Sequence, residues 1–315
     1  MAKTNVIRKY YIIFIVIILG LTLSISFIWI RFSENKEAEM ILSKKEWMKI
    51  HKENRIKTLT FNVKNGGEGA FSEDNRRPRI LKMLKAYYPD IIGYQEVTKD
   101  WLNWFDTDAF SELYSYYGKP RQPDKANSEY SLIMYNHERF TMKDSGDFWL
   151  NEDVAADPAS TSTKTGWDAS RPRNCSWVLL EDKATQLQLV VMNTHFDHKG
   201  IQAVIHSANL MLNMADRWEL PVIITGDFNT SEASAAYEAL TKGNYDNAKY
   251  IAKDTMSWAT SPGFLNKGTQ FGEVIDHILL RKNTFEVEEY KVITEDYEGG
   301  RVSDHYPVLA VFSLD

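Results

Sequence analysis

The sequence predicts a mixed-sheet α/β domain in which two sheets pack face to face with helices outside them. Two observations predict this class. Short segments rich in β-branched and aromatic residues recur after residue 55, and helical patterns lie between several of them. Strands and helices alternate in the first and third quarters, whereas the middle and end are typical of β-hairpins. The segment of about 260 residues suits one large domain better than two small ones.

The predicted strands are short, apolar and bounded by turn-forming residues. They are Ile56–Val63, Ile91–Gln95, Tyr130–Tyr135, Ser176–Leu180, Leu187–Asn193, Val222–Thr225, His277–Arg281 and Val308–Ser313. Apolar residues at helical spacing predict three helices, at Arg77–Tyr88, Ile201–Trp218 and Ser231–Leu240, the last capped by Thr230 or Ser231. The polar stretch Asn151–Arg173 predicts a long loop, which in a compact domain is usually functional or disordered.

The first 55 residues differ from the rest of the chain. Residues 10–30 contain no charged residue, and roughly 20 apolar residues span a hydrocarbon core of about 30 Å. Basic residues precede this stretch, which keeps residues 1–9 in the cytoplasm, and no small-x-small cleavage site follows it. The sequence therefore favours a single-pass signal anchor in the cell membrane, a stalk at 31–55 and an extracytoplasmic domain at 56–315. A cleaved signal peptide and a buried core helix are the alternatives.

Charge and cysteine content restrict the function classes. Beyond residue 50 the chain carries 29 Lys and Arg against 39 Asp and Glu, a net charge of −10. A domain with a net negative charge lacks the overall positive surface that attracts long nucleic acid. A basic groove or a bound metal can make the potential positive locally. Cys175 is the single cysteine, which excludes an intramolecular disulfide. Its place before an apolar run is typical of a buried small hydrophobe.

Polar side chains collect at the ends of the predicted strands. Taken singly, an Asn in a strand or a lone His is more often a satisfied core group, and Asp227 and Asn229 alone are ordinary turn formers. Seven such strand ends in one domain favour convergence on a common ligand, because ligands of α/β sheets bind at strand ends. The residues are Asn62, Gln95, Glu96, Glu129, Asn193, His195, Asp197, Asp227, Asn229, Asp276, His277, Ser303, Asp304 and His305.

These residue types favour a hard divalent metal. Carboxylates and Asn side chains without thiols form an oxygen site suited to Mg²⁺ or Mn²⁺. The Asp-His and Asn-x-His pairs do not match zinc-binding spacings. Mg²⁺ held by one or two carboxylates and several waters is the usual arrangement for acting on phosphates. The histidines then carry protons and donate hydrogen bonds to the phosphate.

The ordered motifs "FNV", "QEV", "NTHFDH", "GDFN", "IDHI" and "SDHYPV" resemble the endonuclease/exonuclease/phosphatase superfamily over residues 56–313. The combination of "QE", "GDFN" and "SDHYP" is specific, and the motif order is that of the family. The bacterial branch with deoxyribonuclease I-like, Ccr4-like and sphingomyelinase-like members is the nearest in pattern. The resemblance implies a four-layer α/β sandwich of two mixed sheets flanked by helices. It also implies an Mg²⁺-dependent phosphoesterase that hydrolyses a phosphodiester by in-line attack of water.

The same resemblance implies a metal site and a water site. Glu96 would be the principal Mg²⁺ ligand, with Asn62 beside it and Asp304 sharing the metal. Asp227 and Asn229 would hold and activate the attacking water. Phosphoryl transfer needs such positioning and charge stabilisation more than covalent chemistry.

The resemblance also implies a phosphate site. His305 would contact the scissile phosphate with Asp276 behind it, and His195 would do so from the opposite side with Glu129 as its acid. A carboxylate behind a histidine fixes its tautomer and raises its pKa, so both rings would be able to carry charge. Arg173 would bind phosphate, with Arg171 as the competitor and Asn193 on the same substrate side.

The substrate stays open at this level. The candidate substrates are a lipid head group, a nucleic acid or nucleotide, and a small phosphorylated compound. The enzymatic alternatives are therefore a cell-surface nuclease and a phosphomonoesterase. A catalytically inactive binding module is the other class, but the central residues of the motifs are all present. No obligate protein partner is evident. The aromatic residues Trp101, Trp104, Phe105, Trp149 and Trp167 either line a substrate rim or, as aromatics do more often, fill the core.

Overall fold

The computed structural model describes residues 55–265, 269–270 and 272–314. The predicted cytoplasmic segment 1–9, the anchor 10–30 and all of the stalk except Arg55 lie outside the described residues. Within the described part of the chain, no helix has both the length and the apolar character needed to cross a membrane.

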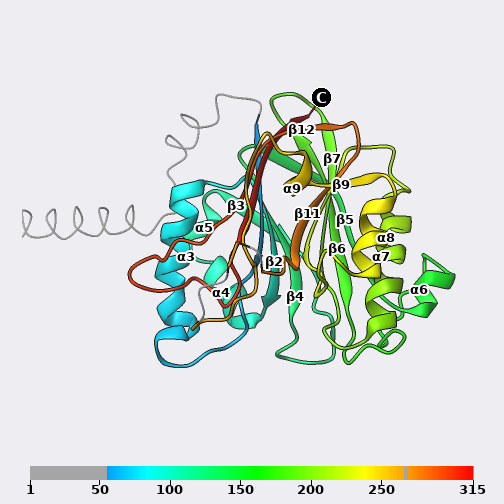
Figure 1. The fold of residues 1–315 in the computed structure, drawn as a ribbon, viewed down its shortest axis with the longest axis horizontal. Helices are drawn as coiled ribbons and strands as arrows, with labels where there is room; N and C mark the ends of the chain where they lie inside the picture. Colours follow the sequence, from blue (N-terminus) through cyan, green and yellow to red (C-terminus); the bar gives the residue numbers. More distant parts are fainter. Residues whose placement is uncertain (1–54, 266–268, 271, 315) are drawn as a thin grey trace, which may run out of the picture.

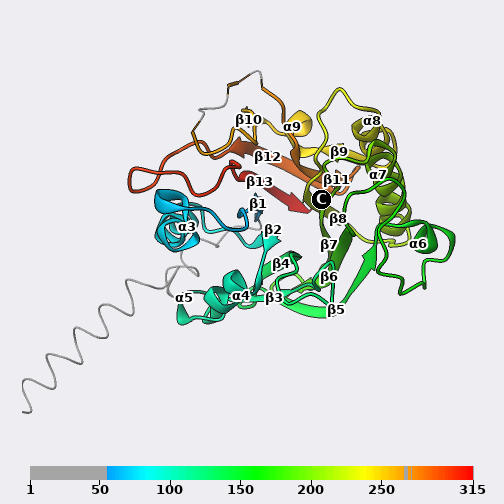
Figure 2. The same cartoon turned by 90° about the horizontal axis from the view of Figure 1, so that it is seen from below.

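Two mixed sheets lie face to face at the centre of the molecule (Figures 1 and 2). The first has the strand order β10 (Asp254–Met256), β12 (Phe285–Val292), β13 (Val308–Leu314), β1 (Ile56–Asn62), β2 (Ile91–Val97), β4 (Tyr130–Asn136) and β3 (Tyr114–Tyr117). The second has the order β5 (Phe140–Trp149), β6 (Asn174–Asp182), β7 (Gln188–His195), β8 (Val222–Asp227), β11 (Asp276–Arg281) and β9 (Tyr245–Asn247). The pairs β1/β2, β7/β8 and β10/β12 are parallel, and the other pairs are antiparallel.

Helices cover the outer face of each sheet (Figure 1). On the first sheet lie η1 (Gly69–Phe71), α3 (Glu73–Tyr87), α4 (Lys99–Phe105) and α5 (Asp108–Ser111). On the second lie α6 (Glu152–Ala156), α7 (Ile201–Ala215) and α8 (Ala235–Lys242), while the short α9 (Ala248–Ile251) contacts β11 and β12. One apolar core fills the space between the sheets, and one lies under each helical layer. The predicted α/β architecture of two mixed sheets flanked by helices is confirmed.

All eight predicted strands are present, with their ends shifted by a few residues, but the described residues form five others that the sequence does not predict. Strands β3, β9 and β10 are only three or four residues long, too short to show a period. Strands β5 and β12 carry charged residues through their centres, which hides their alternation. Inside the predicted loop 151–173 the chain forms α6. The cap of α8 is Ser234, whose Oγ accepts the Tyr237 N–H at 3.0 Å, rather than Thr230 or Ser231.

A buried polar network joins the two sheets near the end where the polar residues gather. The amide oxygen of Asn193 accepts hydrogen bonds from Gln95 Nε2 at 2.7 Å and from Thr225 Oγ1 at 3.0 Å. Its amide nitrogen donates to the carbonyls of Tyr94 and Leu132. Every polar atom of this fully buried side chain is therefore used between the sheets. Asn193 holds the sheets together, which corrects its prediction as a substrate-binding residue.

The cysteine and the aromatic residues serve the core. Cys175 is buried and free, as predicted. Trp101 and Phe105 are buried, and Trp104 packs against both from the same helix. Trp149 is also buried, and its indole N–H donates to a backbone carbonyl at 2.8 Å. Trp167 stacks on His206 on the outer side of α7. The core interpretation therefore holds for all five residues, because the partly buried Trp104 and Trp167 each pack against an apolar core.

Candidate active site

The topology brings the strand-end residues to one end of the molecule. Parallel pairs β1/β2 and β7/β8 end there, and β11 and β13, which run antiparallel to their neighbours, begin there. Because each sheet contributes one half, the site forms only when the sheets are packed together. The residues that meet are Asn62 at the end of β1, Glu96 near the end of β2, His195 and Asp227 at the ends of β7 and β8, Asp276 at the start of β11, and Asp304 and His305 before β13.

The carboxylate of Asp227 is the centre of the site. Its Oδ2 accepts a hydrogen bond from Asn62 Nδ2 at 2.9 Å, which links the two sheets directly. The same oxygen lies 3.5 Å from Nε2 of His195 and 3.8 Å from Nε2 of His305. Its Oδ1 accepts the backbone N–H of Asn229 at 3.0 Å. Burial, followed by repulsion from Asp276, raises the pKa of Asp227 above its ordinary value.

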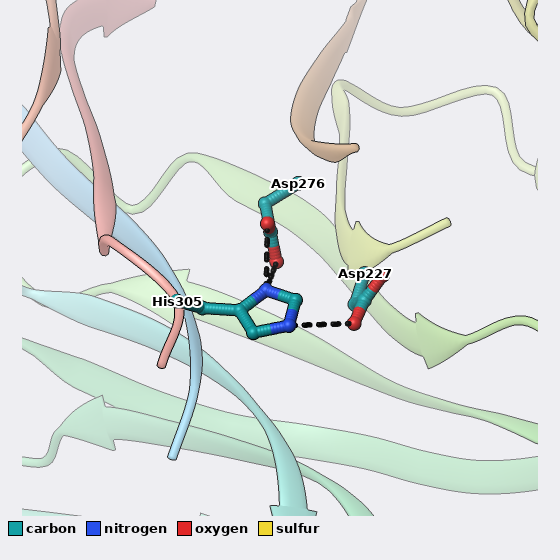
Figure 3. Close-up of side chains that lie close together, drawn as sticks. All are labelled: Asp227, Asp276 and His305. Carbon is teal, nitrogen blue, oxygen red and sulfur yellow. Dashed lines mark hydrogen bonds and ion pairs between the residues drawn. The ribbon is translucent and has the colours of Figure 1, made fainter. Parts of the chain in front are cut away.

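His305 lies between two buried carboxylates (Figure 3). Its Nδ1 is 2.9 Å from Oδ2 and 3.2 Å from Oδ1 of Asp276, and its Nε2 points toward Asp227 and the Ser261 hydroxyl, 3.1 Å away. Burial alone would lower the pKa of His305, but Asp276 and then Asp227 outweigh it and raise the pKa well above its usual value. The imidazole is therefore charged at neutral pH, and the predicted contact with Asp276 is present.

Glu96 is placed by an irregularity in β2. The pairing of β2 with β4 shifts register between Tyr94 and Val97, and Glu96 has a φ of 58°, a left-handed conformation that is uncommon for a non-glycine residue. Its carboxylate accepts hydrogen bonds from Asn62 Nδ2 at 3.1 Å and from the Asn65 N–H at 2.9 Å. The bulge turns a side chain at the end of a buried strand toward the site.

A lysine ammonium lies between the two carboxylates that the sequence assigns to the metal. Lys64 Nζ is 3.7 Å from Glu96 Oε2 and 3.8 Å from Asp304 Oδ2. Burial would raise the pKa of Glu96, but Lys64, the Asn65 N–H and the Asn62 amide lower it below its ordinary value. The Asn62 side-chain amide donates hydrogen bonds to Glu96 and to Asp227. Its oxygen accepts the backbone N–H of Lys64 at 3.0 Å. In this orientation Asn62 bridges the two acids as a hydrogen-bond donor.

The loop that carries Lys64 is fixed by a buried arginine that the sequence did not single out. Arg76 of α3 is fully buried and stacks over Trp101. Burial lowers its pKa to about 10 despite the neighbouring acids. Its guanidinium donates hydrogen bonds to five backbone carbonyls, which belong to Val63, Lys64, Gly66, Phe71 and Val302. Arg76 thus ties the segment after β1 to the segment that leads into Asp304.

Two groups of side chains are able to hold a cation. Asp227, Asp276 and His305 each offer one ligand atom within 4.8 Å of the others, and this buried cluster is consistent with a metal site. Glu96 and Asp304 form the second group, and a positive ammonium already lies between them. Glu96 and Asp304 offer only carboxylate oxygens, which are the ligands that a hard divalent cation prefers, so their assignment to the metal stays a prediction beside this cluster.

The opposite side of the site is rich in arginine. Arg173 is 4 % exposed, and its Nε and Nη1 have no hydrogen-bond partner among the described residues. Its Nη2 is 3.3 Å from His198 Nδ1, and its Nε is 3.6 Å from the Asp197 carboxylate. Burial and the neighbouring Arg121 lower the pKa of Arg173 to about 10, so it remains charged at neutral pH. Nη1 and Nε make no hydrogen bond to a described residue, although Nε lies near the Asp197 carboxylate, so this cation is well suited to an oxyanion.

The expected pairing of Glu129 with His195 is wrong. Glu129 instead forms an ion pair with Arg121 at 3.0 Å, and no hydrogen bond or ion pair joins it to His195 in the described structure. Burial, then Arg173 and Arg121, lower the pKa of His195 well below its ordinary value. His195 is therefore neutral, whereas the sequence predicted two histidines able to carry charge.

Asn229 and Arg171 complete the set of predicted residues. Asn229 has a φ of 47°, its backbone N–H contacts Asp227, and its Nδ2 donates to the Phe196 carbonyl at 2.9 Å. These contacts fix it beside the central carboxylate. Arg171 is exposed, unlike the buried Arg173. The predicted choice of Arg173 over Arg171 therefore has a physical basis in burial.

Comparison with known proteins agrees with this geometry. A sequence model described as the Endonuclease/Exonuclease/phosphatase family matches residues 59–305. An endonuclease/exonuclease/phosphatase structure from Bacteroides vulgatus is 30 % identical, with a TM-score of 0.75, over 84 % of this chain and 100 % of that chain. A mannosyl-6-phosphatase structure from Bacteroides thetaiotaomicron is 28 % identical, with a TM-score of 0.73, over 82 % and 99 % of the two chains. An uncharacterised protein of Acanthamoeba polyphaga mimivirus is 27 % identical over 82 % of this chain and 100 % of its own length.

Proposed function

The chain belongs to the endonuclease/exonuclease/phosphatase family and is a phosphoesterase of that family. On this basis we propose that it hydrolyses a phosphodiester by in-line attack of water, with Mg²⁺ or Mn²⁺ as cofactor. The observation that carries the proposal is the position of the Asp227 carboxylate. It lies within 4 Å of a neutral and of a charged imidazole, and it is fixed by Asn62 and Asn229. A base and an acid are thus placed side by side.

In the proposed reaction Asp227 is the base and His305 is the hydrogen-bond donor to the phosphoryl group. Asp227, whose pKa is raised, accepts the proton of a water held against it and Asn229, because a base works best when its pKa approaches the operating pH. His305, kept charged by Asp276, donates a hydrogen bond to the phosphoryl group and stabilises the charge that develops on it. Asp276 fixes the tautomer and orientation of the ring through Nδ1.

Glu96 and Asp304 would hold the cation, and the donor set fits one because carboxylate oxygens are the ligands that Mg²⁺ prefers. When bound, Mg²⁺ supplies Lewis-acid stabilisation of the phosphoryl oxygens. Lys64 lies between the same carboxylates and would be displaced toward solvent or the phosphate. Arg173 holds the other side of the phosphate through N–H groups that make no hydrogen bond to a described residue, and the neutral His195 lies on the same side.

Phosphomonoester hydrolysis is the second candidate. A buried arginine with two unused N–H groups suits a terminal phosphate, which presents three unesterified oxygens, and a phosphatase is among the similar structures. A cell-surface nuclease is less favoured, since the domain is negative overall. We also keep anchorage in the cell membrane as a proposal, and it rests on the apolar residues 10–30 alone.

The test is a substrate panel with the purified full-length chain. Aryl phosphodiesters, aryl phosphomonoesters, single-stranded DNA and RNA, and phospholipids are incubated with Mg²⁺, with Mn²⁺ and with EDTA. The proposal expects metal-dependent turnover that EDTA abolishes, with diesters preferred to monoesters. The opposite preference would select the second candidate. Absence of metal-dependent turnover across the whole panel would refute both.

A further inference from the structure

A glycine-rich loop follows β1 and reaches a carboxylate that the sequence assigns to the metal. Gly66 and Gly67 in this loop have φ values of 74° and 122°. Lys64 has a φ of 60°, which is uncommon for a residue with a side chain. The backbone N–H of Asn65 donates a hydrogen bond to Glu96 Oε2 at 2.9 Å. Such a backbone conformation persists only where the surrounding structure holds it.

Arg76 of α3 holds this loop on both sides of Asn65. Its Nη2 donates hydrogen bonds to the Lys64 carbonyl at 2.9 Å and to the Gly66 carbonyl at 2.8 Å. The arginine side chain is fully buried, and in the described structure no hydrogen bond or ion pair joins it to Glu96. Arg76 therefore fixes the position of Glu96 through the backbone of Asn65.

The same guanidinium reaches the segment that carries the other predicted metal ligand. Its Nη1 donates to the Val302 carbonyl at 3.3 Å, two residues before Asp304. Between them in the chain, the Ser303 hydroxyl donates to the Asn62 carbonyl at 2.7 Å and joins this segment to the end of β1. The five N–H groups of the guanidinium thus have five backbone carbonyls as acceptors.

A third segment, between β10 and β11, packs on the same arginine. The guanidinium carbon of Arg76 lies 5.6 Å from the centroid of the Phe264 ring, and this ring stacks on Phe71 with 4.5 Å between the centroids. One residue earlier, the Gly263 N–H donates to the Asp304 carbonyl at 2.9 Å. Arg76 is therefore the common contact of the loop that holds Glu96 and of the two segments that fix the backbone of Asp304.

We propose that Arg76 is a positioning residue for the cation site, and that it sets the affinity for Mg²⁺ by fixing the backbone around Glu96 and Asp304. Replacing a group that orients metal ligands without touching the metal typically costs about 10–100-fold in metal affinity. The inference rests on the proposed function, in which Glu96 and Asp304 hold the cation. It adds a residue of α3, outside the strand ends, to the set that determines cation binding.

The test compares Arg76→Lys with Arg281→Lys. Both variants keep the positive charge, but a lysine has fewer N–H donors than an arginine, so some carbonyls lose their hydrogen bonds. Arg281 is the matched control, because its guanidinium also donates to three backbone carbonyls and lies at the opposite end of β11 from Asp276. Calorimetric titration with Mg²⁺, without substrate, gives the Kd of each full-length protein.

Arg76→Lys should raise the Kd for Mg²⁺ at least about tenfold. Arg281→Lys should leave the Kd unchanged, although both variants should lower the melting temperature because buried carbonyls lose their partners. An unchanged Kd in a folded Arg76→Lys protein, or an equal rise in both variants, would reduce Arg76 to a structural residue and overturn the inference.

A second pair of variants decides the question if Arg76→Lys does not fold. Glu73 Oε1 accepts the Gly66 N–H at 2.9 Å, so Glu73→Ala loosens the same loop and should also raise the Kd for Mg²⁺. Asp74→Ala is its charge-matched control, because Asp74 is the neighbouring acid and pairs with Arg77 instead. Equal Kd values in these two variants would overturn the inference.

Glu96→Ala separates this inference from the proposed function. Unchanged Mg²⁺ binding in Glu96→Ala would show that the cation lies elsewhere, and the cation assignment of the proposed function would fail. Weakened binding in Glu96→Ala together with normal binding in Arg76→Lys would refute only the role of Arg76.

Discussion

At the scale of single residues, the site separates two histidines by their charge. Both imidazole Nε2 atoms lie within 4 Å of the same Asp227 oxygen. Asp276 stands behind His305 and keeps it protonated, whereas His195 faces Arg173 and Arg121 and remains neutral. Pairs of titratable groups whose surroundings push their pKa values apart are typical of acid–base sites. We therefore expect unequal effects when they are replaced.

His305→Ala should lower kcat at least about 10²-fold, the range typical of losing a positioned acid–base group. Asp276→Asn should cost less, because the ring stays in place while its charge and orientation weaken. Steady-state kinetics with the best substrate of the panel measure both, and the melting temperature of each variant serves as the folding control. Near-normal turnover by His305→Ala would remove this residue from the mechanism.

Asp197 supplies a pH test that involves no proposed metal ligand. Burial would raise the pKa of Asp197, but the N–H groups of Gly200, Ser170 and Lys199 hold it well below its ordinary value. Because the pKa is lowered in the folded state, the ionised Asp197 carboxylate stabilises the fold fully above the unfolded-state pKa of about 3.9. This stabilisation is lost as the pH falls below that value toward the lower folded-state pKa. Asp197→Asn should therefore lower the free energy of unfolding by about 1–3 kcal/mol at pH 7.

The difference between the wild type and Asp197→Asn should shrink between pH 5 and pH 3. Urea denaturation of both proteins at several pH values measures it. A difference that stayed constant over this range would show that the carboxylate charge does not contribute.

At the scale of elements, the sheets are locked in register by a contact that only glycine permits. A Cβ added to Gly93 of β2 would lie 2.0 Å from Thr225 Oγ1 and 2.7 Å from Asn193 Oδ1. Both atoms belong to the network between the sheets, so neither is free to move without losing a hydrogen bond. The close approach of β2 to β7 and β8 thus depends on the absence of a side chain.

Gly93→Ala should destabilise the protein by about 1–3 kcal/mol, the usual cost of overpacking a close-packed interior. Gly243→Ala is the control, because a Cβ there meets no atom within 4 Å and the φ of Gly243 is −89°. Chemical denaturation compares the two variants. Equal stabilities would mean that the sheets separate easily at this point.

Buried strands and the polar residues that follow them can be predicted from the local sequence, whereas partners distant in the sequence cannot. Buried strands such as β8 were predicted because their residues are apolar throughout, and the site residues were predicted because they follow such strands. Arg76 and Arg121 were missed, since a charged residue in a charged segment looks like a surface residue. Their roles come from backbone carbonyls and an acid that only folding brings near. Glu129 was misassigned because Arg121, eight residues earlier in the sequence, is a competing partner that the motif pattern does not reveal.

At the scale of the whole molecule, the site is a product of both sheets. Asn62 and Glu96 come from the first sheet, and His195, Asp227 and Asp276 come from the second. The hydrogen bond between Asn62 and Asp227 closes the gap between them. Acids come from both sheets, since Glu96 belongs to the first and Asp227 and Asp276 belong to the second. In the proposed mechanism the phosphate is held between the cation on Glu96 and Asp304 and the guanidinium of Arg173.

The most direct test of the account is the Mg²⁺ dependence of turnover and of Mg²⁺ binding in Glu96→Ala and Asp276→Asn. If Glu96 and Asp304 hold the cation, Glu96→Ala should raise the half-saturating Mg²⁺ concentration at least about tenfold, and high Mg²⁺ should restore part of kcat. Asp276→Asn should lower kcat with the Mg²⁺ midpoint unchanged, and calorimetry on the full-length protein should give the same order of affinities. The reverse result, a shifted midpoint in Asp276→Asn and an unshifted one in Glu96→Ala, would place the metal on Asp227, Asp276 and His305 and contradict the account.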